Sequence, residues 1–488
     1  MNSSVLLTSE GTYPFYHGGV STWCNQLIGH AADVDFHLFS IVHSPSQRMA
    51  FTLPANVRGV DKLSLWGTEE AGGLPIPFSE SYQRKLQTTA DAIARDFLPS
   101  FSIVVRSAFD GLAANPAALG KAFHRLHRYF EKYDYAVTLT SRLAWECFKE
   151  CSTSQGAMAF DEATICMRWL VRYLAITARP YPSVNVVHAS MAGLAAVPGV
   201  LAKLRDGTPF LLTEHGIHLR ELYVSLSRMQ VSAACRRFLL GWNQAIVRMN
   251  YHHADHVTCL GEFNRKWQVL FGADPSKIEF VPNGVDPRRF YPDPQCRHER
   301  KTVLTLARIF PLKGIDTLVR AAAIILARAP ETRFRILGEV ADTAYFAECE
   351  RLIRENRLEG AIEFGVTKTP ETEMRAAHVY CLPSVSEGLP YTLLEAMFSG
   401  CPIVATDVGN IAETLHGTGM LVAPGNPEEL ASALLTLLVG PGAETLRGSL
   451  SAAARERALR RFTLEKSMRP FVERYETLQR CNDIPQLA

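Results

Sequence analysis

The stretch SVSEGLPYTLLEAM, residues 384–397, decides the fold of this chain. It follows a short apolar run at 379–382, which predicts a buried strand. Pro390 suits the first turn of a helix, because its missing N–H group needs no partner there. The N-terminus of such a helix favours a phosphate, since its N–H groups are unpaired and the positive end of the helix dipole lies there. The stretch therefore predicts a strand, a glycine-bearing turn and a helix that together bind an anion.

Two carboxylates flank that predicted anion site. Glu387 precedes the helix and Glu395 lies inside it, while Gly388 and Leu389 are placed where backbone N–H groups face a ligand. Carboxylates accept hydrogen bonds from sugar hydroxyls. The combination predicts a site for a sugar joined to a diphosphate. By itself the same spacing also fits a helix N-terminus with two solvated acidic side chains, so the companion motifs matter.

Two cations follow the apolar run 302–306, which predicts another buried strand. Arg308 and Lys313 lie in the loop after it. A departing diphosphate needs such cations, because its negative charge grows as the glycosidic bond breaks. Arginine can hold two phosphate oxygens, whereas lysine acts as a point charge. We expect these two side chains to bind the diphosphate; the alternative is two surface cations before a helix.

The start of the chain repeats the pattern of strand, glycine loop and helix. An apolar strand at 5–8 is followed by Gly18 and Gly19, and a helix begins after them. Adjacent glycines let a backbone come close to a ligand, and the helix N-terminus favours an anion. The motif is not G-x-G-x-x-G, so the dinucleotide fingerprint is absent. The two glycines are candidate donor-binding residues, or they form a plain tight turn.

Histidines supply further candidates in the first half of the chain. His215, in T-E-H-G at 213–216, follows the predicted strand at 210–213, and ligands of α/β sheets bind beyond the carboxyl ends of strands. It could donate to a phosphate or move a proton, or it could make a structural hydrogen bond. His252 and His256 are four residues apart, but no third ligand lies at a recognised spacing, so no metal site is expected.

Composition narrows the class of protein. A chain of 488 residues is too long for one ordinary hydrophobic core, so more than one domain is expected. Its content of 47% hydrophobic and 20% charged residues is typical of globular proteins. A net charge of +2 gives no sign of nucleic-acid binding. Eleven scattered cysteines without a C-x-x-C pair indicate reduced thiols and a cytoplasmic protein. With neither a signal peptide nor an apolar run of ~20 residues, the chain is expected not to span a membrane.

The motifs together resemble a known enzyme family. E-x7-E from Glu387 to Glu395, R-x4-K-G at 308–314 and V-P-N-G-V-D at 281–286 resemble the retaining GT-B glycosyltransferases of the GT4 type. The stretches at 8–23 (TSEGTYPFYHGGVSTW) and 213–221 (TEHGIHLRE) look like the PelF-type GT4 glycosyltransferases of Pel exopolysaccharide biosynthesis. Some GT4 enzymes carry a histidine at the position of Ser190, so that catalytic histidine is not transferred here, and His188 or His215 is left to assist.

The resemblance implies an α/β architecture of the GT-B type, with two Rossmann-like doubly wound domains facing a cleft. The alternation of strands and helices agrees with parallel sheets. We expect an acceptor-side domain at 1–290 with a helical insertion at about 66–180. A nucleotide-sugar-binding domain is expected at 291–463, and a C-terminal helix at 464–488 that crosses back to the first domain.

The resemblance also implies an activity: a retaining hexosyltransferase (EC 2.4.1.-) that moves a hexose from a UDP-sugar to a growing polysaccharide of the biofilm matrix. No metal or other cofactor is expected, and the partner would be an inner-membrane synthase complex. The residues implied in catalysis are Glu387, Lys313, Arg308 and His215. Those implied in donor binding are Gly18, Gly19, Arg308, Lys313, Glu387, Gly388, Leu389 and Glu395.

Other functions stay open from the sequence. The chain could be a nucleotide-sugar-binding subunit that is active only within a synthase complex. It could also be an ADP-glucose-dependent glycogen-type synthase, which the helical insertion disfavours, or less readily a phosphorylase with a pyridoxal cofactor. The residues do not specify the hexose, the acceptor or the oligomeric state.

Overall fold

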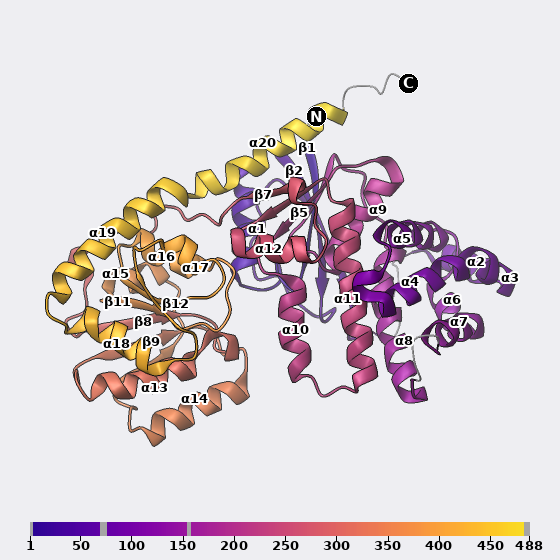
Figure 1. Cartoon of the computed structure of the whole chain (residues 1–488). Coiled ribbons are helices and arrows are strands. Elements are labelled where there is room, and N and C mark those ends of the chain that lie inside the picture. Colours follow the sequence, from indigo (N-terminus) through magenta and orange to yellow (C-terminus); the bar gives the residue numbers. More distant parts are fainter. Residues whose placement is uncertain (1–2, 69–75, 154–157, 483–488) are drawn as a thin grey trace. The chain divides into compact units, whose positions relative to one another are not determined.

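The computed structural model describes residues 3–68, 76–153 and 158–482 (Figure 1). The chain divides into two compact units. The first unit comprises Met1–Cys259, Arg265–Phe280 and Phe471–Ala488, and the second comprises Leu260–Asn264 and Val281–Pro470. Each unit is built on one parallel sheet covered by helices, so the predicted doubly wound GT-B class of fold is confirmed. Within the described residues, no helix has the length and apolar character needed to cross a membrane.

The sheet of the first unit has the strand order β3-β2-β1-β4-β5-β6-β7. Its neighbouring strands pair in parallel, and the central β1 is buried almost throughout, as expected for a sheet covered on both faces. The strands are β1 (Ser3–Glu10), β2 (Val34–Val42), β3 (Val57–Ser64), β4 (Val186–Ala189), β5 (Phe210–Glu214), β6 (His256–Cys259) and β7 (Ile278–Phe280). The strand order reverses beside β1, where ligands of such sheets bind.

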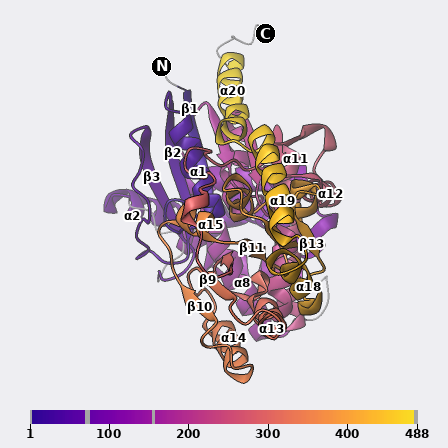
Figure 2. The ribbon, with the colours of Figure 1, turned by 90° about the vertical axis from the view of Figure 1, so that its left-hand side faces the viewer.

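The edge strand β3 was not expected from the sequence. Its residues V-R-G-V-D-K-L-S contain no apolar run, and most of them are exposed or half-buried. β3 lies at the edge of the sheet and pairs with β2 alone, so its side chains can stay exposed. Its backbone hydrogen bonds to β2 hold it in the sheet, and no apolar pattern in its own sequence is required. Figure 2 shows β1, β2 and β3 side by side.

A helical segment separates β3 from β4, in the region where the insertion at about 66–180 was expected. Residues 69–75 and 154–157 of that insertion lie outside the described residues. Its helices are α2 (Phe78–Gln87), α3 (Ala90–Ala92), α4 (Leu98–Asp110), α5 (Pro116–Phe130), α6 (Tyr135–Leu139), α7 (Arg142–Thr153) and α8 (Phe160–Leu174), with a π-helical turn at Ile93–Phe97 and 3-10 turns at Gly111–Ala113 and Ala175–Ala178. The aromatic side chains Phe97, Phe101 and Phe123 are fully buried, so they belong to the core of this unit.

The remaining helices of the first unit connect its strands. They are α1 (Gly19–His30), α9 (Val197–Asp206), α10 (His218–Arg228), α11 (Ala233–His253) and α12 (Glu262–Leu270), with 3-10 turns at Leu194–Ala196 and Pro275–Lys277. The 21-residue α11 packs against α4 and α5, which joins the insertion to the sheet-bearing part of the unit.

The sheet of the second unit has the order β10-β9-β8-β11-β12-β13, all pairs parallel. The strands are β8 (Thr302–Leu306), β9 (Arg333–Leu337), β10 (Ile362–Gly365), β11 (Val379–Leu382), β12 (Ile403–Thr406) and β13 (Met420–Val422), and β8 and β11 coincide with the runs at 302–306 and 379–382. The helices are α13 (Ile315–Leu326), α14 (Thr343–Glu355), α15 (Pro370–Ala376), α16 (Tyr391–Phe398), α17 (Ile411–Leu415), α18 (Pro427–Leu438) and α19 (Ala443–Arg461), with 3-10 turns at Pro294–Cys296 and Pro311–Lys313.

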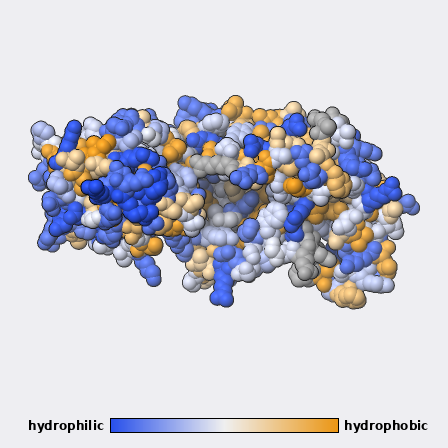
Figure 3. All heavy atoms as spheres, turned by 90° about the horizontal axis from the view of Figure 1, so that it is seen from below, coloured by the Kyte–Doolittle hydropathy of each residue, from blue (hydrophilic) through white to orange (hydrophobic). Residues whose placement is uncertain are grey.

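The exposed face of α14 is strongly polar. Arg351 pairs with Glu348 at 2.6 Å and with Glu355 at 2.5 Å, one helical turn to each side. In the view of Figure 3, hydrophilic residues gather over the part of the second unit where α13 and α14 lie. This face of the unit is therefore a solvated surface.

The last helix, α20 (Leu464–Asn482), contributes to both units, and residues 483–488 lie outside the described part. Its residues up to Pro470 belong to the second unit and those from Phe471 onward belong to the first. In the first unit Tyr475 is fully buried and its hydroxyl lies 2.5 Å from Nδ1 of His188. The ring of Phe471 packs edge-on against Trp23, with centroids 5.3 Å apart.

Candidate functional site

The candidate site of the second unit lies at the carboxyl ends of β8, β11 and β12. Arg308 and Lys313 follow β8, Glu387 follows β11, and Gly409 and Asn410 follow β12. These three strands are neighbours in the sheet, so their loops meet at one edge. The strand order reverses between β8 and β11, which is where open α/β sheets bind their ligands.

An ion pair joins the two loops at that reversal. The Lys313 Nζ atom lies 2.6 Å from Oε1 of Glu387, and Ser384 Oγ donates to the same oxygen at 2.6 Å. The Glu387 side chain is 8% exposed and that of Lys313 is 20% exposed. Partial burial strengthens a charge-assisted bond. The structure thus brings together two side chains that lie 74 residues apart in the sequence.

Phe310 connects the second cation to this pair. The guanidinium carbon of Arg308 lies 5.3 Å from the centre of the Phe310 ring, and Lys313 Nζ lies 5.7 Å from it. One aromatic ring thus interacts with both cations. Phe310 was missed in the sequence, although an aromatic residue between two cations is a usable signal. Arg308 is exposed, and within the described residues it makes no ion pair, so the site carries an uncompensated positive charge.

The turn between β11 and α16 presents backbone N–H groups. In the described structure, the amides of Gly388 and Leu389 have no hydrogen-bond acceptor. Their carbonyl oxygens are fixed instead: Asn283 Nδ2 donates to Leu389 O at 2.8 Å and the Asn410 amide donates to Gly388 O at 3.1 Å. The turn is therefore held from its carbonyl side, which leaves its amides available to an anion.

Two glycines are required by close approaches around this turn. Gly314 has φ of 62°, and a Cβ atom there would lie 2.1 Å from the carbonyl oxygen of Pro383. Gly409 has φ of 61°, and its Cβ would lie 2.0 Å from the carbonyl oxygen of Glu387. Both positions also favour glycine for conformational reasons. The roles of Asn283 and Gly409 were not predicted, because they depend on contacts between distant loops.

The helix after the turn begins one residue later than predicted. Pro390 has φ of −70° and ψ of 135°, so it is extended and precedes the helix, and α16 starts at Tyr391. Proline suits this position as well, because it has no N–H group to pair. The correction leaves the amides of the turn in place.

Glu395 lies further along α16 and is half-buried. Burial raises its pKa to about 7; Arg289 lowers this pKa and Glu371 raises it. Its carboxylate has no hydrogen-bond partner among the described residues. Burial raises the pKa of Tyr380, and the charges of Glu387 and Glu395 raise this pKa further. The two glutamates therefore lie near one side chain, although Glu395 is not part of the Lys313 ion pair.

In the first unit, the predicted glycine loop lies at the start of α1. Gly18 and Gly19 are exposed, and a Cβ atom on Gly18 would meet nothing within 4 Å. Packing within this chain therefore does not explain glycine at position 18. The N-terminus of α1 has no side-chain cap, which leaves its amides to solvent or to a ligand.

The two candidate histidines of the first unit have different surroundings. The His188 ring is fully buried, with Nδ1 2.5 Å from the Tyr475 hydroxyl and Nε2 2.7 Å from Oγ1 of Thr213. Burial lowers the pKa of His188 to about 3, so it stays neutral and structural. His215, 8% exposed, packs against the ring of Trp23 with centroids 4.7 Å apart.

A buried carboxylate supports the loop that carries His215. Glu214 is fully buried; it accepts hydrogen bonds from the Tyr251 hydroxyl at 2.5 Å, from Gln268 Nε2 at 3.2 Å and from the His218 amide at 3.0 Å. Burial raises the pKa of Glu214. Its three donors fix the T-E-H-G turn, a role that the sequence did not indicate. Across residues 3–68, 76–153 and 158–482, no cluster of three or more His, Cys, Asp or Glu side chains is arranged to hold a metal ion.

Two family models match the chain. Residues 3–276 match the model described as a domain of unknown function, DUF3492, and residues 300–439 match the model described as glycosyl transferases group 1. The first match covers more than half of the chain.

Curated relatives include two proteins named D-inositol 3-phosphate glycosyltransferase. The one from Kineococcus radiotolerans is 34% identical over 41% of this chain and 52% of its own length. The one from Kribbella flavida is 32% identical over 54% of this chain and 65% of its own length. A GDP-mannose-dependent alpha-(1-6)-phosphatidylinositol monomannoside mannosyltransferase from Mycobacterium tuberculosis is 28% identical over 58% of this chain and 78% of its length. The chain thus spans about half to two thirds of the first relatives that it matches.

Solved structures agree on the fold. A sucrose-phosphate synthase from Thermosynechococcus elongatus has a TM-score of 0.63 at 18% identity and covers 99% of this chain and 100% of its own. Anabaena HepE in complex with UDP and glucose has a TM-score of 0.60 at 15% identity and covers 98% of this chain and 100% of its own. At these identities the likeness is one of fold.

Proposed function

Because the chain belongs to the DUF3492 family and carries a group 1 glycosyl transferase domain after it, we propose that it is a retaining, GT4-like hexosyltransferase (EC 2.4.1.-) with a UDP-sugar donor. The observation that carries the proposal is the Lys313–Glu387 ion pair of 2.6 Å beside the unpaired amides of Gly388 and Leu389. A cation, a carboxylate and free N–H groups at one turn match the needs of a diphosphate joined to a sugar.

Each residue of the donor site receives a role in this proposal. Arg308, Lys313 and the amides of Gly388 and Leu389 stabilise the departing UDP, and Glu387 contacts the sugar ring. Glu395 accepts hydrogen bonds from the ribose hydroxyls, since its carboxylate has no partner of its own in the described structure. In the first unit, Gly18 and Gly19 approach the donor and His215 assists.

The proposed reaction needs no metal and no acid–base pair at glycosidase spacing. The acceptor hydroxyl attacks the anomeric carbon from the face that UDP leaves, so a new C–O bond forms as the bond to the phosphate oxygen breaks. The proton of that hydroxyl passes to the departing phosphate oxygen. The cations of the site neutralise the charge that grows on UDP as the bond breaks.

The choice of UDP rests on a fold neighbour and has a competitor. HepE is described in complex with UDP, whereas one curated relative is GDP-mannose-dependent. Uridine, guanosine and adenosine diphosphates therefore all belong in the test. An ADP preference would favour the glycogen-type alternative.

The proposed setting is synthesis of a Pel-type exopolysaccharide for a biofilm matrix. It is supported by the resemblance of residues 8–23 and 213–221 to the PelF-type enzymes. The partner would be an inner-membrane synthase complex, with this protein on the cytoplasmic side and peripheral to the membrane. The acceptor would then be a growing glycan.

Turnover by the purified chain tests the proposal. UDP release from UDP-glucose, UDP-N-acetylglucosamine and UDP-N-acetylgalactosamine is measured with the wild type, with R308A/K313A and with R320A/R354A. The control pair removes two exposed arginines of α13 and α14. We expect release from one donor, lost in R308A/K313A and kept in R320A/R354A. UDP binding without turnover would instead indicate a binding subunit that needs its synthase.

A further inference from the structure

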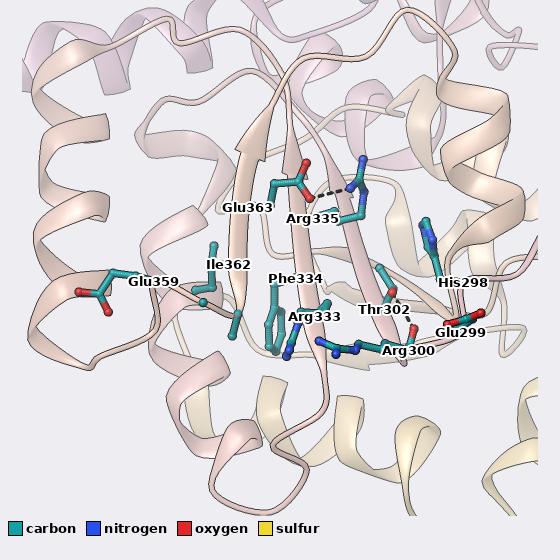
Figure 4. Close-up of a pocket in the computed structure, with 12 residues that line it drawn as sticks. His298, Glu299, Arg300, Thr302, Arg333, Phe334, Arg335, Glu359, Ile362 and Glu363 are labelled. Carbon is teal, nitrogen blue, oxygen red and sulfur yellow. Dashed lines mark hydrogen bonds and ion pairs between the residues drawn. The ribbon is translucent and has the colours of Figure 1, made fainter.

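A pocket of the second unit lies at the opposite end of its strands from the donor site. It has a volume of about 670 Å³ and is bordered by the amino ends of β8, β9 and β10, where Thr302, Arg333 and Ile362 begin these strands (Figure 4). The strands are parallel, so the loop of Arg308 and Lys313 emerges from the other edge of the sheet. Its volume lies within the range of small-molecule sites. We call it the amino-edge pocket.

Two arginines of the amino-edge pocket carry uncompensated charge. Figure 4 shows the side chains of Arg300 and Arg333 beside the amino ends of the strands, at the same end of the pocket. Arg333 Nη1 donates to the carbonyl oxygen of Thr332 at 3.0 Å, which anchors its guanidinium group. Neither arginine forms an ion pair in the part of the chain that the structure describes. Two positive charges without partners in one pocket favour the binding of an anion there.

A third arginine of the same pocket shows the contrast. Arg335 Nη1 lies 2.6 Å from Glu363 Oε2, and its Nη2 lies 3.0 Å from Glu373 Oε1. Its charge is therefore satisfied within the protein. Arg335 is paired with carboxylates, whereas Arg300 and Arg333 are not. We therefore expect an anion to bind at the end of the pocket formed by Arg300 and Arg333.

The rest of the lining offers partners for hydroxyl groups. The Nε2 atom of His298 is buried and has no hydrogen-bond partner in the described structure. A buried polar atom without a partner destabilises the protein, and a ligand group that pairs with it would recover that cost. Glu299 is an exposed lining residue without an ion pair among the described residues, and carboxylates accept hydrogen bonds from sugar hydroxyls, whereas the side chain of Glu359 points away from this part of the pocket (Figure 4).

We propose that the amino-edge pocket is a second binding site, separate from the donor site, for a phosphorylated hexose. Arg300 and Arg333 bind the phosphate group, and each guanidinium can hold two of its oxygens. His298 Nε2 and the carboxylate of Glu299 bind the hydroxyls of the sugar. The site is formed within the second unit and does not depend on the proposed transferase activity.

Calorimetry with galactose 6-phosphate as the probe tests this site. The titration uses the full chain carrying R308A/K313A, so that phosphate binding at the donor cations does not contribute. We expect one binding event per chain, weakened at least tenfold when R300A/R333A is added and unchanged when R320A/R354A is added instead. The two pairs remove the same charge from the same unit, so the comparison separates a built site from general attraction. Galactose alone and inorganic phosphate alone should each bind at least tenfold more weakly.

Three results would overturn the proposal: no binding of galactose 6-phosphate, an equal loss in both arginine pairs, or inorganic phosphate binding as tightly as the sugar phosphate. A parallel titration of UDP into otherwise wild-type R300A/R333A protein should match the wild type. If the chain binds galactose 6-phosphate but no nucleoside diphosphate, the second site stands and the proposed function fails. The opposite pattern would remove this site and leave the transferase proposal intact.

Discussion

At the scale of single residues, Glu395 is the side chain whose charge the structure makes most adjustable. Burial raises its pKa to about 7, so near neutral pH it is close to half ionised. Glu387, in contrast, is held by Lys313 and Ser384 at 2.6 Å each. The E-x7-E spacing therefore joins two carboxylates in different states: one fixed in an ion pair and one available to a ligand.

The raised pKa predicts that UDP affinity depends on pH through Glu395. Ribose hydroxyls donate to the ionised carboxylate, so binding favours deprotonation and affinity rises as pH increases through about 7. Glu395 is about one tenth ionised at pH 6 and about nine tenths ionised at pH 8, so the UDP affinity should rise by about tenfold between these pH values. Calorimetric titrations at both pH values measure it.

Glu395→Gln is the matched control for that pH dependence, because it keeps the shape of the side chain and removes its titration. UDP's own ionisation affects both proteins equally. We expect the wild type to gain affinity with pH more steeply than the variant. Equal slopes would show that Glu395 does not contact the nucleotide.

Tyr475 gives a prediction about stability at the same scale. Tyr475→Phe removes the hydroxyl that pairs with His188 Nδ1 at 2.5 Å and leaves a fully buried ring nitrogen without that partner. Loss of such a buried hydrogen bond costs about 1–3 kcal/mol in the free energy of unfolding, measured by urea denaturation. Tyr82→Phe, at an exposed position of α2, should change it little. A Tyr475→Phe protein as stable as the Tyr82→Phe protein would contradict the structural role of His188.

At the scale of elements, the donor turn between β11 and α16 depends on neighbouring loops for its shape. The loops after β8 and β12 come close to the turn at Gly314 and Gly409. A Cβ atom on Gly314 would lie 2.1 Å from the carbonyl oxygen of Pro383, and one on Gly409 would lie 2.0 Å from that of Glu387. Asn283 and Asn410 hold the carbonyl groups of the turn. The orientation of the amides is thus a property of four segments together.

Gly314→Ala tests that dependence. The substitution forces a left-handed conformation on alanine and places its Cβ 2.1 Å from the Pro383 carbonyl oxygen, so the loop must shift. We expect a loss of about 2 kcal/mol or more in the free energy of unfolding, with weaker UDP binding because Lys313 moves with the loop.

Gly448→Ala is the control for the glycine substitution. Gly448 lies inside α19, where a Cβ atom meets nothing within 4 Å, and alanine there should stabilise the protein by up to about 1 kcal/mol. If Gly314→Ala were as stable as Gly448→Ala and bound UDP normally, the close approach would not shape the site.

Much of the element scale was predictable from the sequence. The strands β8 and β11 of the second unit were predicted because each is a short, mostly apolar run followed by a turn, and the donor residues come in the loops after those runs. The strand β3 was missed because an edge strand needs no apolar pattern. Asn283 and Gly409 were missed because their roles arise from contacts between segments that are distant in sequence.

At the scale of the whole molecule, the described residues offer no cluster suited to a metal ion, while the donor site carries two cations around Phe310. The proposal assigns to Arg308 and Lys313 the charge neutralisation that a divalent ion supplies in other enzymes. The fold as a whole was predicted from the alternation of strands and helices, which specifies layers. The identities of the sugar donor and of the acceptor were not predicted from the residues, because they depend on contacts that a single sequence does not reveal.

Turnover in excess chelator follows from this assignment. We expect UDP release in 10-fold molar excess of EDTA over any added metal to stay within about twofold of the untreated rate, because protein cations stabilise the leaving group. Added Mg²⁺ should change it as little. Loss of activity in EDTA that Mg²⁺ restores would contradict the metal-free proposal.

The most direct test of the central claim is a calorimetric titration of UDP into the wild type, Lys313→Ala and Lys121→Ala, with GDP and ADP alongside. Lys121 is an exposed lysine of the helical insertion, so its removal is the matched control. We expect the wild type and Lys121→Ala to bind UDP in preference to GDP and ADP, and Lys313→Ala to lose at least tenfold in affinity, about 1.4 kcal/mol. UDP binding that is absent, or equally tight in Lys313→Ala, would contradict a donor-diphosphate site at the turn after β11.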